Sequence, residues 1–87
     1  MARKIIVLGD ATSHGGEVIS GSPTSRIDGK AIARVGDKVS CPIQGHGTNA
    51  IVEGDPGLLV DGLPAALEGH KTECGCSLIG SAAATRP

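Results

Sequence analysis

An internal repeat is the feature that most constrains how this chain can fold. Residues 27–41, IDGKAIARVGDKVSC, align with residues 60–74, VDGLPAALEGHKTEC, so that an Asp-Gly pair, a central Ala, a later Gly and a final Cys coincide. A third, partial copy begins at Gly9, where GDATSH corresponds to GDKVSC at 36–41 and to GHKTEC at 69–74. Self-similarity of this kind indicates one small structural unit that is used three times.

Turn-forming residues separate short apolar runs along the whole chain. The 14 glycines and five prolines fall between these runs, and no window of about a dozen residues has helical apolar spacing without a Gly or Pro inside it. An Asp-Gly pair between apolar runs, as at Asp28 and Asp61, is a strong signal for a hairpin turn. The sequence therefore predicts an all-β fold of short hairpins in three related units.

The hydrophobic core of such a chain is small. The 87 residues include no Phe, Tyr or Trp, and they predict a single domain over residues 1–87. One core of this size supplies only about 3–5 kcal/mol, so a metal, a disulfide or a partner subunit is expected to stabilise the fold. Residues 3–81 are expected to be ordered, and residues 82–87, which have no strand pattern, are expected to form a loose tail.

Charge and composition argue against several classes of function. A net charge of −1 and the lack of aromatic residues argue against nucleic-acid binding. The apolar run at residues 5–8 is too short for a signal peptide, and no run approaches the roughly 20 residues of a membrane span. We therefore expect synthesis in a reducing cytoplasm, where three cysteines indicate metal binding or catalysis before disulfides.

Potential metal ligands recur at one position of the repeat. His14, Cys41 and Cys74 end the corresponding turns of the three copies, and three units around a pseudo-threefold axis would bring them together. His46 follows Cys41 in a C-x4-H spacing, and His70 precedes Cys74 in an H-x3-C spacing. Imidazole nitrogen and thiolate sulfur are ligands that zinc prefers, in tetrahedral sets of four. The sequence therefore predicts a Zn²⁺ site.

These donors favour a structural site over a catalytic one. Five donors compete for four positions, whereas a catalytic zinc keeps one position open. A small zinc hydrolase would need Asp10, Asp37 or Glu68 as a general base, but Gly-Asp recurs as a turn signature in two of the copies. Cys76 is interpreted as a core thiol. The chain is therefore not expected to be an enzyme; a zinc hydrolase and a zinc-stabilised adaptor remain the alternatives.

The repeat resembles a known family. GKAIARVGD at 29–37 and GLPAALEGH at 62–70 resemble the paired G-x-P-[AV]-A-R-x-G-D elements of the PAAR-repeat proteins. HGG at 14–16, CP at 41–42, HG at 46–47 and CG at 74–75 are also similar to the family's pattern. The resemblance covers about residues 3–81. The chain departs from the pattern at Leu67, which replaces the arginine, and at His70, which replaces the aspartate.

The resemblance implies a non-enzymatic structural role. PAAR proteins form the conical tip of the bacterial type VI secretion spike, where one monomer caps the trimeric β-helix of a VgrG protein. The tip sharpens the spike for membrane puncture, which is a mechanical contact, and it can help to carry effector proteins. The resemblance also implies export from the bacterial cytoplasm by type VI secretion, to the extracellular space or a target cell, without a signal peptide. Short apolar residues are expected to line the base of the cone, such as Ile5, Ile6, Ile32 and Val60.

The resemblance further implies a set of zinc ligands. In the family, a zinc near the vertex is held by three histidines and one cysteine, which implies His14, His46, His70 and one thiolate in this chain. Cys74 is the preferred thiolate because it forms a short chelate with His70. Cys41, its equivalent in the repeat, is the rival thiolate ligand.

Overall fold

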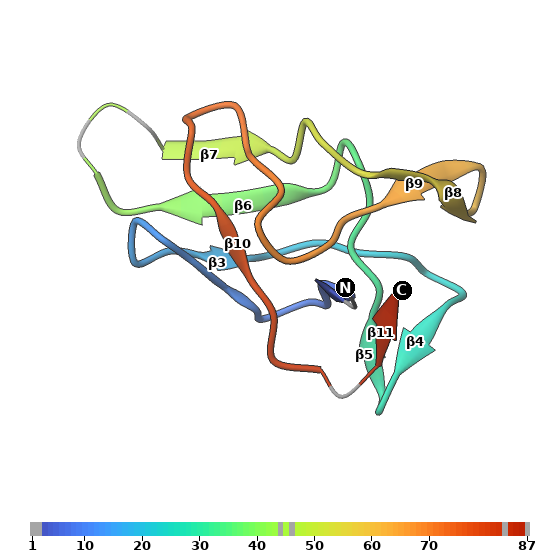
Figure 1. Ribbon diagram of the computed structural model, residues 1–87. Coiled ribbons are helices and arrows are strands. Elements are labelled where there is room, and N and C mark those ends of the chain that lie inside the picture. Colours follow the sequence, from blue (N-terminus) through green and yellow to red (C-terminus); the bar gives the residue numbers. More distant parts are fainter. Residues whose placement is uncertain (1–2, 44, 46, 83, 87) are drawn as a thin grey trace.

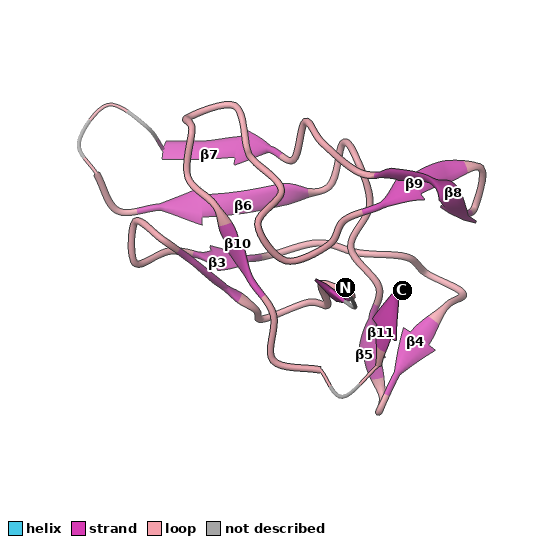
Figure 2. Cartoon of the chain, viewed as in Figure 1, coloured by secondary structure: helices cyan, strands magenta, loops and turns pink. Residues whose placement is uncertain are grey.

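The chain is built from short strands joined by turns (Figure 1). The computed structural model describes residues 3–43, 45, 47–82 and 84–86, and no helix occurs among them, as Figure 2 shows. The strands are β1 Arg3–Lys4, β2 Ala11–Thr12, β3 Glu17–Val18, β4 Arg26–Ile27, β5 Lys30–Ala31, β6 Lys38–Cys41, β7 Gly47–Ala50, β8 Asp55–Val60, β9 Leu63–Ala65, β10 Leu78–Ile79 and β11 Thr85–Arg86. The prediction of an all-β fold is confirmed.

The three copies of the repeat join edge to edge. A five-stranded antiparallel sheet runs in the order β10-β2-β3-β6-β7, so it takes strands from all three copies. An isolated antiparallel bridge between Ile51 and Thr72 links the residue after β7 to the third copy. The remaining sheets are the two-stranded pairs β4–β5, β8–β9 and β1–β11. Hydrogen bonding between copies therefore holds together strands that are individually only two to six residues long.

A ring of three backbone hydrogen bonds marks the pseudo-threefold axis. The amide of Ile6 donates to the carbonyl of Ala66, the amide of Ala66 to that of Ala33, and the amide of Ala33 to that of Ile6, each at 2.9 Å. All three residues are fully buried, and each occupies the same place in its copy of the repeat. The hydrogen bonds thus relate the three copies to one another as the repeat predicts.

The main apolar core also follows the repeat. Val18, Ile51 and Leu78 are each 1% exposed, and they pack in one cluster with the ring residues. The residue after each of them is about half exposed, because successive side chains of a strand point to opposite faces; these residues are Ile19, Val52 and Ile79. Each inward side chain contributes roughly 1.5–3 kcal/mol by burial, and small aliphatic groups alone fill this core.

One turn is repeated after the ring. The amide of Val7 donates to Oδ2 of Asp10 at 2.9 Å, and the amide of Arg34 donates to Oδ2 of Asp37 at 2.8 Å. The glycine before each aspartate has a left-handed backbone, with φ of 90° at Gly9 and 95° in the second copy. Other residues adopt that conformation only at a cost. This geometry explains why Gly-Asp recurs in the sequence.

Two of the two-stranded sheets are hairpins that turn at Asp-Gly pairs, as predicted. The φ angles are 51° and 80° at Asp28 and Gly29, and 55° and 79° at Asp61 and Gly62. Two consecutive left-handed residues are typical of the type I′ turn, whose twist matches that of the flanking strands. Both hairpins lie toward the right of Figure 1, whereas β3, β6 and β7 lie farther to the left.

The third two-stranded sheet pairs the two ends of the chain. Arg3 lies opposite Arg86 and Lys4 opposite Thr85, and the amide of Ile5 donates to the carbonyl of residue 84 at 3.1 Å. The expectation of a loose tail over 82–87 is therefore wrong for residues 84–86. In the second and third copies, the equivalent strands β5 and β9 pair with the strands that precede them, β4 and β8, in hairpins. In the first copy, β1 pairs with the C-terminal strand β11 instead.

The apolar residues that were expected to line an open base lie mainly inside the fold. Ile5, Ile6 and Val60 are 9%, 0% and 7% exposed, and Ile32 is half-buried. The prediction is therefore wrong for the first three residues, because pairing between the copies encloses Ile5 and Ile6 and Val60 is buried within the β8–β9 hairpin.

Candidate metal centre

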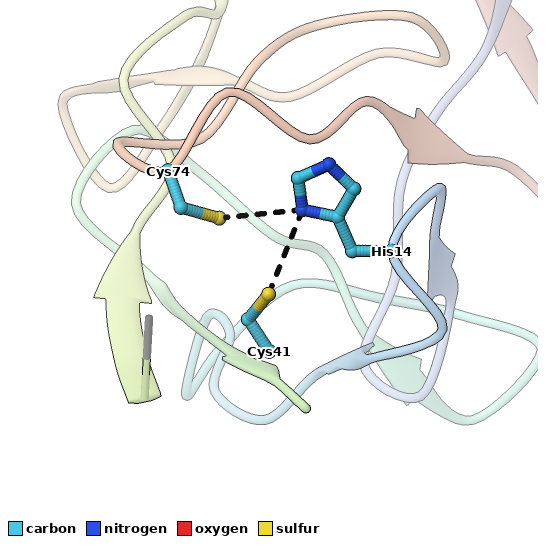
Figure 3. A group of neighbouring side chains, drawn as sticks. All are labelled: His14, Cys41 and Cys74. Atoms are coloured by element: carbon cyan, nitrogen blue, oxygen red, sulfur yellow. Dashed lines mark hydrogen bonds between the residues drawn. The ribbon is translucent and has the colours of Figure 1, made fainter. Parts of the chain in front are cut away.

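Three turns bring His14, Cys41 and Cys74 together (Figure 3). His14 lies in the turn between β2 and β3, Cys41 ends β6, and Cys74 lies in the turn before β10. Their ligand atoms all lie within 4.8 Å of one another. The prediction that these equivalent positions of the repeat converge is confirmed.

The distances between these atoms suit a tetrahedral metal ion. Nδ1 of His14 lies 3.6 Å from Sγ of Cys41 and 3.9 Å from Sγ of Cys74. A Zn–S bond of about 2.3 Å and a Zn–N bond of about 2.0 Å, at the tetrahedral angle, place sulfur and nitrogen about 3.5 Å apart. Both sulfur atoms point toward Nδ1 in Figure 3, so a single ion among the three atoms could contact all of them. The three residues fit zinc.

The two thiols of this group differ in acidity. Burial raises the pKa of Cys74, but hydrogen bonds with the Thr72 hydroxyl, the backbone and thiol of Cys76 and the His14 ring outweigh it and lower this pKa to about 5. Burial raises the pKa of Cys41, and the neighbouring Cys74 thiol adds to that rise. One thiolate is therefore favoured at neutral pH. A bound cation would favour the second, because metal ligation requires the deprotonated sulfur.

Cys76 lies behind Cys74 and belongs to the core. It is fully buried, and its Sγ lies 3.5 Å from Sγ of Cys74 and 2.9 Å from Oγ1 of Thr72. Its interpretation as a core thiol is confirmed. No disulfide joins any of the three cysteines.

His70 makes a different contact from those of His14, Cys41 and Cys74. Its Nδ1 accepts a hydrogen bond from the amide of Leu67 at 2.9 Å, which is the bond that aspartate accepts in the other two copies. The structure does not place His70 in the group of His14, Cys41 and Cys74. Because Nδ1 is occupied, only Nε2 of this ring is left for a metal. The ring instead stabilises the turn of the third copy.

His46, the remaining expected ligand, lies outside the described residues. Its role as a ligand therefore stays a prediction from the C-x4-H spacing. The connection that contains it, between Cys41 and Ile51, is longer than the corresponding connections of the other copies.

The carboxylates that a hydrolase would need are used in structural hydrogen bonds. Asp10 accepts from the amide of Val7 and from the hydroxyl of Ser81. Asp37 binds the amide and the guanidinium of Arg34, and an oxygen of Glu68 accepts from the amide of Gly80 at 3.0 Å. None of these three belongs to the described metal-ligand group. Their roles are explained by the turns that they hold.

A family comparison agrees with the repeat and its turns. The family model of the PAAR motif matches residues 8–80, most of the chain. The chain belongs to the PAAR-motif family. PAAR proteins are structural components of the type VI secretion spike tip and are not an enzyme family. No curated protein sequence matches the chain.

The described ligand group differs from the ligand set that the resemblance implied. The family pattern implied one cysteine and three histidines, whereas the described residues converge as one histidine and two cysteines. Sγ of Cys41 and Sγ of Cys74 both lie near Nδ1 of His14, so the structure brings both candidate thiolates to the group. The signal for this was in the sequence: the repeat places His14, Cys41 and Cys74 at one equivalent position. Within the described residues there is also no helix long and apolar enough to cross a membrane.

Proposed function

We propose that this chain is the metal-stapled tip of a type VI secretion spike, where one copy caps the trimeric β-helix of a VgrG protein. The observation that carries the proposal is the ring of Ile6, Ala33 and Ala66, which relates three units of one chain about a single axis. Such a chain can offer a similar element to each subunit of a trimer. Membership of the PAAR family supports the same role.

The proposed metal is Zn²⁺, held by Nδ1 of His14 and by the thiolates of Cys41 and Cys74. His46 is the proposed fourth ligand, since its longer connection begins directly after Cys41. A bound zinc would link three turns that are far apart in the sequence. Structural zinc sites contribute to folding free energy, with apparent binding energies of about 10–16 kcal/mol in small domains. The three turns position these donors, and Asp10, Asp37 and Glu68 accept structural hydrogen bonds from backbone amides.

The metal centre is proposed to form the leading end of the molecule. The turns that carry its ligands lie away from the hairpins β4–β5 and β8–β9, so those hairpins are left to face the spike. A rigid point at the metal end would meet a target membrane mechanically. We further propose that the chain leaves the bacterial cytoplasm with the spike and reaches the extracellular space or a target cell, together with effector proteins.

A direct binding experiment tests the capping role. The zinc-loaded chain is mixed at micromolar concentration with the purified trimeric β-helical end of a VgrG protein from the same bacterium, and the complex is measured by size-exclusion chromatography with light scattering. The expected complex contains one copy of this chain per trimer. The trimer with its terminal β-helical turns deleted is the control, and it should not bind. Equal retention of the chain by both trimers, or by neither, would contradict the proposed function.

A further inference from the structure

Cys74 and Cys76 lie in one tight turn of the third copy. The amide of Thr72 donates to the carbonyl of Cys76 at 3.1 Å, and the amide of Gly75 donates to the carbonyl of Thr72 at 2.9 Å. Gly75, between the two cysteines, has a left-handed backbone with φ of 86°, which turns the chain back on itself. The turn therefore places the two thiols side by side, with their sulfur atoms 3.5 Å apart.

The first copy of the repeat has the same turn without the second thiol. The amide of Thr12 donates to the carbonyl of Gly16, and the amide of Gly15 donates to the carbonyl of Thr12, each at 3.0 Å. The φ angle of Gly15 is 85°. Gly16 thus occupies the place that Cys76 has in the third copy, so the backbone of this turn does not require a cysteine there.

The two sulfur atoms of the third copy are in contact but not bonded. The hydroxyl oxygen of Thr72 lies 3.3 Å from Sγ of Cys74 and 2.9 Å from Sγ of Cys76, so one side chain contacts both thiols. A disulfide has a sulfur–sulfur distance of about 2.05 Å. Rotation of the two cysteine side chains within the turn must therefore bring the sulfur atoms closer by about 1.5 Å.

The two thiols differ in their access to solvent. Cys74 is half-buried, whereas Cys76 is fully buried. A small oxidant in solution therefore reaches Cys74 first, and the sulfur that it oxidises lies against a second, protected sulfur. An accessible cysteine beside a resolving cysteine is the arrangement typical of redox-sensitive thiols.

Cys41 is the other thiol near Cys74, and it belongs to a different element. It ends β6, which pairs with β3 on one side and with β7 on the other. A disulfide to Cys41 would have to draw this paired strand toward the turn of the third copy. A disulfide to Cys76 needs movement within one turn only, so the geometry favours Cys76 as the partner of Cys74.

We infer that Cys74 and Cys76 form an oxidation site, which hydrogen peroxide converts into a reversible disulfide. Sγ of Cys74 attacks one peroxide oxygen, the O–O bond breaks, and the hydroxide that leaves takes up the Cys74 proton as water. Sγ of Cys76 then attacks the resulting sulfenic acid at sulfur, the S–O bond breaks, and the second hydroxide leaves as water with the Cys76 proton. The two sulfurs together lose two electrons, which reduce the peroxide.

The disulfide and a metal ion exclude one another at Cys74. Metal ligation requires the thiolate of this residue, and a disulfide sulfur is not one. Bound zinc should therefore slow the oxidation, and the oxidation should release zinc. This link to the metal rests on the proposed function, under which the chain leaves a reducing cytoplasm.

Oxidation of the purified chain tests the inference. Metal-free and zinc-loaded samples are treated with hydrogen peroxide, alkylated, digested without reductant and analysed by mass spectrometry. In the metal-free chain, the peptide with Cys74 and Cys76 should lose the mass of two hydrogen atoms and take up no alkyl group, while Cys41 is still alkylated. A thiol reductant should restore both thiols. The zinc-loaded chain should react at least about tenfold more slowly and release its zinc to a colorimetric chelator as the disulfide forms.

Two single substitutions are the matched controls. Cys41→Ser should form the same disulfide at an unchanged rate. Cys76→Ser should form no disulfide at that rate, and prolonged oxidation should carry its Cys74 to the sulfinic acid, which a thiol reductant does not reverse. Circular dichroism of both variants shows whether they are folded, and the peptide analysis of the wild-type chain needs no variant.

The outcomes separate this inference from the proposed function. A wild-type disulfide between Cys41 and Cys74, or a reaction that Cys41→Ser loses and Cys76→Ser keeps, would overturn the oxidation site and leave the capping function standing. Equal rates with and without bound zinc would overturn the link to the metal. A chain that binds no zinc would contradict the metal-stapled function, whereas its metal-free reaction with peroxide would still decide whether Cys74 and Cys76 pair.

Discussion

Nδ1 of His70 accepts a hydrogen bond from the backbone amide of Leu67 at 2.9 Å, at the position where Asp10 accepts one from the amide of Val7. An acceptor at Nδ1 requires that the ring carry its proton on Nε2 and be neutral. Burial lowers the pKa of His70, and the positive charge of Arg3 lowers it further, against the opposite effect of Glu53 and Asp55. Protonation of this ring would break the turn bond.

The pKa of His70 predicts an acid-sensitive stability. The folded pKa lies below the unfolded value of about 6.5, so the unfolded chain takes up the proton first as the pH falls. The stability that neutral His70 contributes is complete above about pH 6.5 and is lost as the pH falls toward the folded pKa. His70→Asp should remove this loss, since aspartate stays ionised above about pH 4. Chemical unfolding at several values between about pH 7 and 5 measures the difference between the two proteins.

Both samples contain the same metal concentration, so that the pH dependence of metal binding affects both proteins equally. His70→Ala is the second control: it should be less stable than the wild type at neutral pH, by about 1 kcal/mol for the lost hydrogen bond. A wild-type protein and a His70→Asp variant with parallel pH profiles would contradict the assigned role of the ring.

Removal of the metal should lower stability sharply. A zinc ion held by the three converging turns would contribute binding free energy only to the folded chain, so a strong chelator should reduce the melting temperature. Cys41→Ser and Cys74→Ser should each reduce bound zinc, measured by native mass spectrometry. Cys76→Ser is the matched control, since Cys76 is buried beside Thr72, and it should keep one zinc per chain. Equal zinc content in all three variants would rule out the assigned thiolates.

Gly16 should tolerate no side chain. A Cβ atom at this position would lie 1.8 Å from the carbonyl oxygen of Ser40 and 3.2 Å from Cα of Cys41, so Gly16→Ala must push β3 away from β6. We expect a loss of at least about 3 kcal/mol and weaker zinc binding, because the His14 turn moves away from Cys41. Gly29→Ala, where the new atom meets open space at a φ of 80°, should cost only about 1–2 kcal/mol and leave zinc binding unchanged. Thermal unfolding and zinc titration of both variants check this.

Asp61 should matter more for stability than its equivalent in the first hairpin. Both Asp61 and Asp28 have left-handed backbones, with φ of 55° and 51°, so an alanine substitution costs both hairpins the same backbone strain. Hydrogen bonds from Ser22 and Thr24, with Arg34 nearby, lower the pKa of Asp61 and tie its hairpin to the rest of the fold. Asp61→Ala should therefore have a lower free energy of unfolding than Asp28→Ala. Equal unfolding free energies would show that the polar contacts of Asp61 add nothing.

Local sequence patterns were sufficient for the fold class and for the repeat. The Asp-Gly pairs predict hairpin turns because glycine accepts a positive φ, and both hairpins turn at these pairs. The alignment of His14, Cys41 and Cys74 predicts their convergence, because equivalent positions around an axis meet. The prediction failed at the C-terminus, since nothing in the short run at residues 84–86 shows that it completes a sheet with β1.

The sequence by itself determined the turns, the strands and the three equivalent donors, because each of these depends on residues a few positions apart. Only the tertiary structure decided which face of each strand is buried and what each histidine does. His70 precedes Cys74 in an H-x3-C spacing that suits the chelation of one ion. Its ring nevertheless accepts a hydrogen bond from the amide of Leu67, because of the fold of its own turn. Ile5 and Ile6 looked available to a partner, yet hydrogen bonds between units far apart in the chain enclose them. The direction and the burial of a side chain depend on contacts between segments that are distant in the sequence. Those contacts form only when the three units pack around one axis.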